Sequence, residues 1–306
     1  MTMLVAIGPS SFAESDPAPR RLLDAAGVHV RENPFGRRLT EEEIITQLVG
    51  VDGLLAGLEP LNRRVIASAA PRLKAIARVG IGTANVDFEA AAEFGVKVSN
   101  TPDPPAQAVA EMTLGAMLAL ARQILPMNAA LHAGKWEKAI GIGLSGATLL
   151  LVGYGRIGRR VAALAKAFGA RVLVYDPYLP EETLEEVTQV ASLEAGLAEA
   201  DIVSLHASGD DCLLNSAAFA HMKEGVLLLN SARGELVDEC ALLAALDAGR
   251  VGGLWFDAFV REPYNGPLIR YPQALLTPHT GTYTRQCRLE METAAVHNLL
   301  RDLGIE

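Results

Sequence analysis

Three side chains in the last third of the sequence have the types that proton transfer on an organic acid requires. His279 follows an apolar run and a proline, and an imidazole with an ordinary pKa of about 6.5 can act as both acid and base. Glu262 lies upstream, and a carboxylate bonded to one ring nitrogen raises the basicity of the other. Arg233 offers a planar fork that can hold a carboxylate in two parallel hydrogen bonds. These residues predict an acid–base site for a substrate that bears a carboxylate.

The other five histidines are weaker candidates for that role. His29 lies in an early predicted strand, and His132, His221 and His297 lie in predicted helices, where surface or packing roles are usual. His206 directly follows the apolar run 201–205, which favours a structural role or a place close to a cofactor. We therefore expect His279 to be the acid–base residue.

A glycine-rich turn in the middle of the chain predicts a dinucleotide site. The apolar run 148–152 leads into Gly153, Gly155 and Gly158, and a helical pattern follows over 159–168. In this strand–turn–helix setting the first glycine permits a tight turn, the second lets a pyrophosphate approach the backbone, and the third lets the helix pack closely. The helix N-terminus then offers unpaired N–H groups to phosphates.

The next predicted strand, 171–175, supplies the partner expected of that turn. It ends in Asp176, and a carboxylate about 20 residues after the turn meets ribose hydroxyls. A carboxylate accepts hydrogen bonds from a 2′-hydroxyl and repels a 2′-phosphate, so the sequence favours NAD over NADP. The alternative is a glycine turn that binds nothing, with Asp176 solvated, and the complete strand–turn–helix–strand pattern disfavours it.

Short apolar runs alternate with helical runs along the chain, which is typical of an α/β protein with parallel sheets covered on both faces. The first hundred residues contain five such steps, and Thr40 before three glutamates predicts a helix start. Further strands are predicted at 201–205, 226–230, 254–256 and 275–277. Ligands bind beyond the carboxyl ends of such strands. The expected lining of this crevice is His206, Ser231, Ala232, Arg233, Asp257, Pro278 and His279.

A change of texture after residue 100 indicates a boundary. The segment "PDPP" is a rigid connection and a plausible hinge, and an Ala/Leu/Met-rich helical run follows over 106–125. Its charges, Glu111 and Arg122, argue against a membrane span. A helix that is apolar on all sides is buried, here between domains or subunits.

Composition excludes several classes of protein. The chain has 306 residues, half of them apolar, and a net charge of −9, which argues against a nucleic-acid partner. Three cysteines without paired spacing argue against a disulfide framework and against a metal site. The apolar N-terminal run 3–7 is too short for a signal peptide. We expect a soluble, cytoplasmic protein without membrane or nucleic-acid partners.

Several motifs together resemble the D-isomer-specific 2-hydroxyacid dehydrogenases, most closely the 3-phosphoglycerate dehydrogenase-like branch without a regulatory domain. The likeness runs in order over nearly the whole chain. The motifs are "LKAIARVGIGTANVD", "VGYGRIG", "DIVSLH", "LLNSARGELVDECALLAAL", "FDAFVREP" and "LLTPHTGTYT". The resemblance implies an NAD-dependent interconversion of a small D-2-hydroxy acid and its 2-keto acid, such as 3-phosphoglycerate, hydroxypyruvate or glyoxylate.

The resemblance also implies the architecture. Two doubly wound parallel-sheet domains are expected: a flavodoxin-like substrate domain, 1–99 plus 282–306, and a Rossmann NAD-binding domain, 100–281. Closure of the hinge between them would exclude water from the crevice. The helical run 106–125 is expected to join two cofactor domains in a homodimer.

Residue roles follow from the same likeness. His279 takes or returns the hydroxyl proton, Glu262 stabilises the imidazolium, and Arg233 orients the substrate. The expected NAD-binding residues are Gly153, Gly155, Arg156, Ile157, Gly158, Asp176, His206, Ser231, Ala232, Asp257 and Gly281. The expected substrate-binding residues besides Arg233 are Arg78, Val79, Gly80 and Ile81, where backbone N–H groups can meet an anion.

Some positions depart from the family pattern and leave the substrate open. Pro105 and Ala108 replace an asparagine and a serine that are common in phosphoglycerate dehydrogenases, and Ala207-Ser208 replaces a usual proline. One alternative is an NAD(H)-sensing interaction protein like the family's corepressors, which retain the catalytic residues; the chain shows no interaction tail. Another is a formate or phosphite dehydrogenase relative, although the insertions expected for formate are missing.

Overall fold

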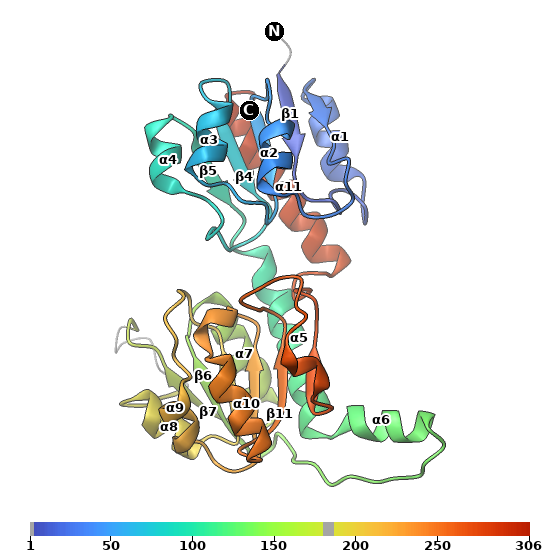
Figure 1. Ribbon diagram of the computed structural model, residues 1–306, viewed down its shortest axis with the longest axis vertical. Helices are drawn as coiled ribbons and strands as arrows, with labels where there is room; N and C mark the ends of the chain where they lie inside the picture. Colours follow the sequence, from blue (N-terminus) through green and yellow to red (C-terminus); the bar gives the residue numbers. More distant parts are fainter. Residues whose placement is uncertain (1–2, 180–186) are drawn as a thin grey trace. The chain divides into compact units, whose positions relative to one another are not determined.

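The computed structural model describes residues 3–179 and 187–306. Its contacts divide the chain into two compact units, Met1–Pro105 with Thr282–Glu306, and Ala106–Gly281 (Figure 1). Each unit is built on one parallel sheet, which confirms the predicted α/β fold class.

The first unit has a five-stranded sheet in the order β2-β1-β3-β4-β5. Its strands β3 and β4 are buried along their whole length, as expected when helices cover both faces of a parallel sheet. The strands are β1 Leu4–Ile7, β2 His29–Arg31, β3 Gly53–Ala56, β4 Ala75–Arg78 and β5 Lys97–Asn100. The helices are α1 Ala18–Ala25, α2 Glu41–Gln47, α3 Arg63–Ala69, α4 Phe88–Glu93 and α11 Arg285–Leu303.

Local chemistry explains where helix α2 begins. The Thr40 hydroxyl accepts a hydrogen bond from the amide of Glu43, and the Glu43 carboxylate accepts one from the amide of Thr40 at 2.8 Å. This reciprocal pair satisfies two amides that have no partner inside the helix. The predicted helix start is confirmed.

The second unit has a seven-stranded sheet in the order β12-β11-β10-β9-β6-β7-β8. The strands are β6 Thr148–Val152, β7 Arg171–Tyr175, β8 Thr188–Gln189, β9 Ile202–Leu205, β10 Val226–Asn230, β11 Val251–Phe256 and β12 Ala274–Leu276. Strand β6 pairs with β7 on one side and β9 on the other, so the winding reverses there. Such a reversal places a crevice at the carboxyl ends of the strands.

Two apolar cores lie on the two faces of this sheet. Leu150 and Val152 face one core, which helices α8 Leu193–Glu199, α9 Ser216–His221 and α10 Glu239–Asp247 help to build. Leu149 and Leu151 face the other, which includes residues of α5 Pro104–Ala121 and α7 Arg156–Ala167. Two short 3₁₀ helices, η2 Gly234–Leu236 and η3 Pro267–Arg270, lie in the loops after β10 and β11.

The expected single helix over 106–125 is wrong. Helix α5 ends at Ala121, and α6 Ile124–His132 begins after a 65° bend. Gln123 adopts a left-handed backbone with φ of 54°, which stops the α-helical path. Among the described residues no single helix is long and apolar enough to cross a membrane, although this bent pair passes by length and composition alone.

Candidate active site

The predicted acid–base residues follow three adjacent strands. Strands β10, β11 and β12 are parallel neighbours, so their carboxyl ends lie at one edge of the sheet. Arg233 comes after β10, Glu262 after β11 and His279 after β12. Arg233 and His279, the outermost of the three, are 46 residues apart in sequence. The fold nevertheless brings all three residues to the same edge of the sheet.

Glu262 and His279 form a direct pair. The Nδ1 atom of His279 lies 2.9 and 3.0 Å from the two carboxylate oxygens of Glu262. A carboxylate only accepts hydrogen bonds, so Nδ1 carries the hydrogen and Nε2 is left to gain or lose a proton. The His279 side chain is 40% exposed, which leaves its ring accessible to a small molecule.

The backbone of His279 is held in an unusual conformation. Its φ is 55°, a left-handed value that a residue with a side chain rarely adopts. The buried carboxylate of Asp257 accepts hydrogen bonds from the Thr280 and Gly281 amides at 2.8 Å and from the Thr277 hydroxyl at 2.6 Å. Asp257 thus clamps both sides of the loop that presents the imidazole.

The Arg233 loop is fixed by a residue that the sequence reasoning missed. The buried Asn230 side chain donates to the carbonyl of Arg233 at 2.8 Å and accepts from the amide of Ala232 at 3.0 Å. A Cβ at Gly234 would lie 2.2 Å from the amide nitrogen of Val260, so this loop packs against the backbone leading to Glu262. The guanidinium of Arg233 donates to the Ala232 carbonyl at 2.7 Å. The sequence signal for Asn230 was its position as the polar residue that ends the apolar run "LLLN".

The glycine turn has the geometry of a phosphate cradle. A Cβ at Gly153 would lie 2.6 Å from the amide nitrogen of Ala207, and one at Gly158 would lie 2.4 Å from the Gly153 carbonyl. Gly155 faces open space and precedes α7 without a side-chain cap. Arg156 and Ile157 begin α7, and the amides of a first turn find no acceptor inside their own helix. These features fit the pyrophosphate of a dinucleotide.

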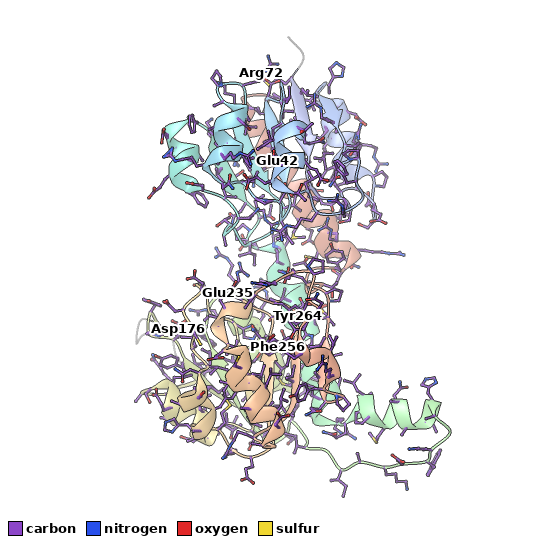
Figure 2. The ribbon with its side chains drawn as sticks, viewed as in Figure 1. Glu42, Arg72, Asp176, Glu235, Phe256 and Tyr264 are labelled. Carbon is purple, nitrogen blue, oxygen red and sulfur yellow. The ribbon has the colours of Figure 1, made fainter. Side chains whose placement is uncertain are left out.

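Asp176 is tied to that turn. Its carboxylate accepts hydrogen bonds from the Tyr154 amide at 2.8 Å and the Tyr178 amide at 3.0 Å. Each oxygen has two lone pairs, so both retain capacity for ribose hydroxyls. Asp176, which is labelled in Figure 2, directly follows β7.

Two buried polar atoms at this sheet edge have no partner among the described residues. They are Nδ1 of His206 and the hydroxyl oxygen of Ser231. The other ring nitrogen of His206 lies 2.9 Å from the Ser204 hydroxyl. Buried polar atoms are normally hydrogen-bonded, so these two also fit a site that a polar ligand completes.

Burial lowers the pKa of His206 to about 4 from an ordinary 6.5. The unfolded chain therefore binds more protons at this side chain between pH 6.5 and pH 4, and the folded state loses about 3 kcal/mol as the pH falls across that range. We expect His206→Gln to flatten the fall of the melting temperature over this interval. Thermal unfolding of both proteins in steps of half a pH unit measures it, and equal slopes would contradict a buried neutral imidazole.

The residues expected to bind substrate besides Arg233 belong to the first unit, in the loop after β4. Here Gly80 has φ of 137°, and its amide donates to the Thr101 hydroxyl at 2.8 Å, while the Val79 amide donates to the Ala56 carbonyl at 2.9 Å. Ile81 follows directly, and its carbonyl accepts from Asn100 at 2.8 Å. Two of the amides expected to meet an anion are thus used within the unit.

Arg78 lies beneath this loop rather than on its surface. Its side chain is buried and donates to the carbonyl of Val79. Glu59, which the sequence reasoning missed, is buried nearby, and burial raises its pKa although the charge of Arg78 opposes this. A charged residue three positions after strand β3 was the signal for Glu59.

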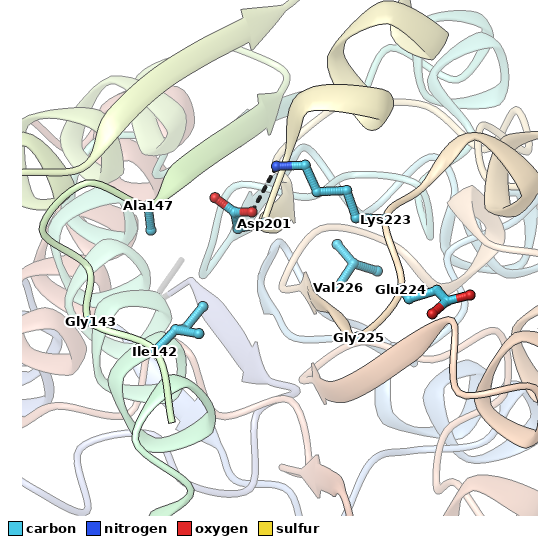
Figure 3. Close-up of a pocket in the computed structure, with 8 residues that line it drawn as sticks. All are labelled: Ile142, Gly143, Ala147, Asp201, Lys223, Glu224, Gly225 and Val226. Carbon is cyan, nitrogen blue, oxygen red and sulfur yellow. Dashed lines mark hydrogen bonds and ion pairs between the residues drawn. The ribbon is translucent and has the colours of Figure 1, made fainter. Parts of the chain in front are cut away.

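A pocket of about 330 Å³ lies at the opposite edge of the second sheet (Figure 3). It is lined by Ala147, Asp201 and Gly225, which directly precede β6, β9 and β10. Asp201 pairs with Lys223 at 2.8 Å and accepts from the Thr148 amide. The predicted site residues follow the strands instead, so this pocket is separate from them.

Comparison with known proteins identifies the family. The family described as "D-isomer specific 2-hydroxyacid dehydrogenase, NAD binding domain" matches residues 114–281. Hydroxypyruvate reductase of Thermotoga maritima is 36% identical over 276 residues, 87% of this chain and 90% of that protein. D-3-phosphoglycerate dehydrogenase of Rattus norvegicus is 37% identical over 280 residues, 89% of this chain and 52% of that protein.

The chain thus spans about half the length of the curated phosphoglycerate dehydrogenases it matches. A solved structure, a glyoxylate reductase from Paecilomyes thermophila, superimposes with a TM-score of 0.86 at 30% identity, covering 99% of this chain and 95% of that chain. The matched domain coincides with the sheet that carries the glycine turn, Asp176 and the Glu262–His279 pair. This chain belongs to the D-isomer-specific 2-hydroxyacid dehydrogenase family, and its residues 114–281 are an NAD-binding domain.

Proposed function

We propose that the chain is an NAD-dependent oxidoreductase that interconverts a small D-2-hydroxy acid and its 2-keto acid. The observation that carries the proposal is the Glu262–His279 pair at the sheet edge next to the Arg233 loop. Candidate substrates are 3-phosphoglycerate, hydroxypyruvate and glyoxylate, which are the substrates named by the relatives' activities.

The proposed mechanism assigns each side chain one task. The bound cofactor would supply the redox chemistry, NAD⁺ as the acceptor of a hydride from C2 of the hydroxy acid and NADH as the donor of a hydride to C2 of the keto acid. Nε2 of His279 removes the hydroxyl proton in oxidation and returns a proton to the oxygen in reduction. The Glu262 carboxylate, bonded to Nδ1, stabilises the imidazolium that forms after proton uptake. Arg233 holds the substrate carboxylate and orients the reacting carbon.

The dinucleotide would be held by the residues around the glycine turn. The amides at the start of α7 would contact the pyrophosphate, and Asp176 would accept from the ribose. His206, Ser231, Ala232, Asp257 and Gly281 would line the rest of that edge. We assign residues 1–99 and 282–306 to substrate binding, with 100–281 as the cofactor domain. The loop proposed for this role contains Arg78, Val79, Gly80 and Ile81, although the amides of Val79 and Gly80 already have acceptors within the unit.

A homodimer completes the proposal. Helix α6 has no buried residue and exposes Leu131, and the segment after it exposes Trp136 and Ile140. Large apolar side chains that are exposed close together in the sequence favour an association surface. We propose that the partner is a second copy of this chain and that formation of the dimer buries these apolar side chains.

We place the protein in the cytoplasm, with small molecules and not nucleic acid or membrane as its ligands. All three cysteines are free thiols, and Cys212 and Cys240 are exposed, which fits a reducing compartment. The net charge of −9 disfavours nucleic acid.

The test of the function is a screen of NADH oxidation with small 2-keto acids, including phosphorylated ones. We expect turnover of at least one of them above the rate with buffer alone. Turnover of none, with NADH still bound, would overturn the proposal and favour an NAD(H)-sensing protein.

Replacement of Asp176 tests the cofactor assignment. Asp176→Ala removes the acceptor for ribose hydroxyls and the charge that repels a 2′-phosphate, so the ratio of kcat/KM for NADH to that for NADPH should fall by about tenfold or more. Asp176→Asn is the control, since it keeps an acceptor oxygen and loses only the charge. A ratio unchanged in both variants would place the selectivity elsewhere in the chain.

A further inference from the structure

The loop that carries Glu262 is pinned by one tyrosine hydroxyl. Tyr264 Oη donates to the Glu239 carboxylate at 2.7 Å and accepts from the Leu268 amide at 3.2 Å. Glu239 is the first residue of α10, and Leu268 lies in η3, so one side chain ties the loop to both elements. Burial, with the Glu239 carboxylate, raises the pKa of Tyr264 to about 12, which keeps the hydroxyl protonated as a donor.

The ring of Tyr264 makes a second contact within the same loop. It stacks on Phe259 with ring centroids 4.3 Å apart and planes 21° from parallel. Phe259 also packs near Phe256, at 6.4 Å between centroids, at the end of β11. Figure 2 labels Phe256 and Tyr264 in this part of the second unit. The loop between them is thus fixed at both ends.

The backbone makes room for this tyrosine. A Cβ at Gly266 would lie 2.4 Å from Tyr264 Oη and 2.5 Å from the adjacent ring carbon, so no larger residue fits there without displacing the phenol. The position of the ring is therefore specified from three sides, by Phe259, by Glu239 and by the glycine.

Phe259 connects the tyrosine to the acid–base pair. Its amide donates to Oε1 of Glu262 at 3.1 Å, and the same oxygen lies 2.9 Å from Nδ1 of His279. Ring stacking on Tyr264 holds Phe259 in place, and the Phe259 amide in turn holds the Glu262 oxygen that orients the His279 imidazole. Hydrogen bonds to the partner of a histidine set the orientation of its imidazole ring, as is well known for metal-bound histidines.

We propose that Tyr264 is a positioning residue for the proton transfer: its hydroxyl and ring hold the loop 259–264 so that Glu262 keeps His279 aligned. This inference rests on the proposed function for its kinetic consequence. Its structural part, the alignment of the imidazole, stands independently of any substrate.

The chain offers closely matched variants. Tyr264→Phe removes only the hydroxyl and Tyr264→Leu removes the ring as well, while Glu239→Gln retains an acceptor oxygen and Glu239→Ala does not. Tyr271→Phe is the control, because the Tyr271 hydroxyl also donates to a carboxylate of α10, Asp247, at 2.9 Å, on an exposed surface away from Glu262.

The first measurement is the proton resonance of the His279 Nδ1–H in the full chain, assigned by its loss in His279→Gln. We expect Tyr264→Phe and Glu239→Ala to move or broaden this signal and to speed its exchange with water at least fivefold. Glu239→Gln and Tyr271→Phe should leave it as in the wild type. An unchanged signal in Tyr264→Phe and Tyr264→Leu, both folded, would overturn the inference.

The second measurement is steady-state kinetics with whichever 2-keto acid the screen identifies. We expect kcat to fall about five- to tenfold in Tyr264→Phe and further in Tyr264→Leu, with KM and the NADH dissociation constant within twofold. An equal loss in Tyr271→Phe would mean a general effect on stability and would contradict the assignment. If the wild type turns over no substrate, the proposed function fails, and the resonance still tests the role of Tyr264.

Discussion

Replacing His279 by alanine is expected to lower kcat by about 10²- to 10⁴-fold, the usual contribution of a positioned general acid or base. Nε2 of this ring is the proposed proton donor and acceptor, since Nδ1 is bonded to Glu262 at 2.9 Å. The glycine turn and Asp176 belong to other strands, so the NADH dissociation constant should stay within about twofold. Stopped-flow hydride transfer and fluorescence titration with NADH measure the two effects separately.

A second histidine–glutamate pair supplies the control. His297 lies 3.1 Å from a Glu306 carboxylate oxygen, on the exposed side of α11 in the first unit. His297→Ala removes the same kind of pair from the first unit, whereas His279 belongs to the second, and should leave kcat within twofold. Near-normal turnover in His279→Ala would remove the imidazole from the mechanism, while an equal loss in both variants would indicate general destabilisation.

The sequence predicted those features that depend on short-range order. Strand–turn–helix patterns with fixed spacing located the glycine turn and β6, and the ends of apolar runs located Arg233 and His279. In parallel sheets all strands end at the same edge, so knowing the strands was enough to group these residues. Residue types alone suggested that Glu262 is the partner of His279, and the resemblance to the family, whose NAD-binding domain matches residues 114–281, implied the same role for it.

The features that escaped prediction depend on contacts between distant segments. The run 106–125 carries continuous helical propensity, and the bend at Gln123 is set by a single left-handed residue that propensity does not reveal. Tyr264 meets Glu239 from 25 positions away, and Asp257 meets Gly281 from 24. No local pattern encodes which polar side chain such a loop will contact.

Asp257 illustrates how a role can be only half visible in sequence. Its place after β11 suggested contact with the cofactor, and the structure gives it three hydrogen bonds to the loop around His279. A carboxylate has four lone pairs, so one remains for a ligand. The sequence does not reveal that Asp257 holds the loop in which His279 has a left-handed backbone, because these contacts exist only in the folded loop.

Replacing Arg233 by alanine is expected to lower kcat/KM for the 2-keto acid by about 10²- to 10³-fold, because two charge-assisted hydrogen bonds to the substrate carboxylate are lost. Asn230 and the contact of Gly234 with Val260 fix the backbone of this loop, so removing the side chain should not displace Glu262. Most of the loss should therefore appear in KM, with a smaller loss in kcat from a misaligned carbon.

Arg233→Lys separates charge from geometry, since lysine keeps the charge and lacks the planar fork. It should recover at most about a tenth of the lost kcat/KM. Arg250→Ala is the matched control, because that guanidinium also donates to a backbone carbonyl, that of Met222 at 2.9 Å, in the same unit. If both Arg233→Ala and Arg250→Ala keep the wild-type KM, another group binds the substrate carboxylate. The next candidate is then the loop after β4, which has Arg78 beneath it.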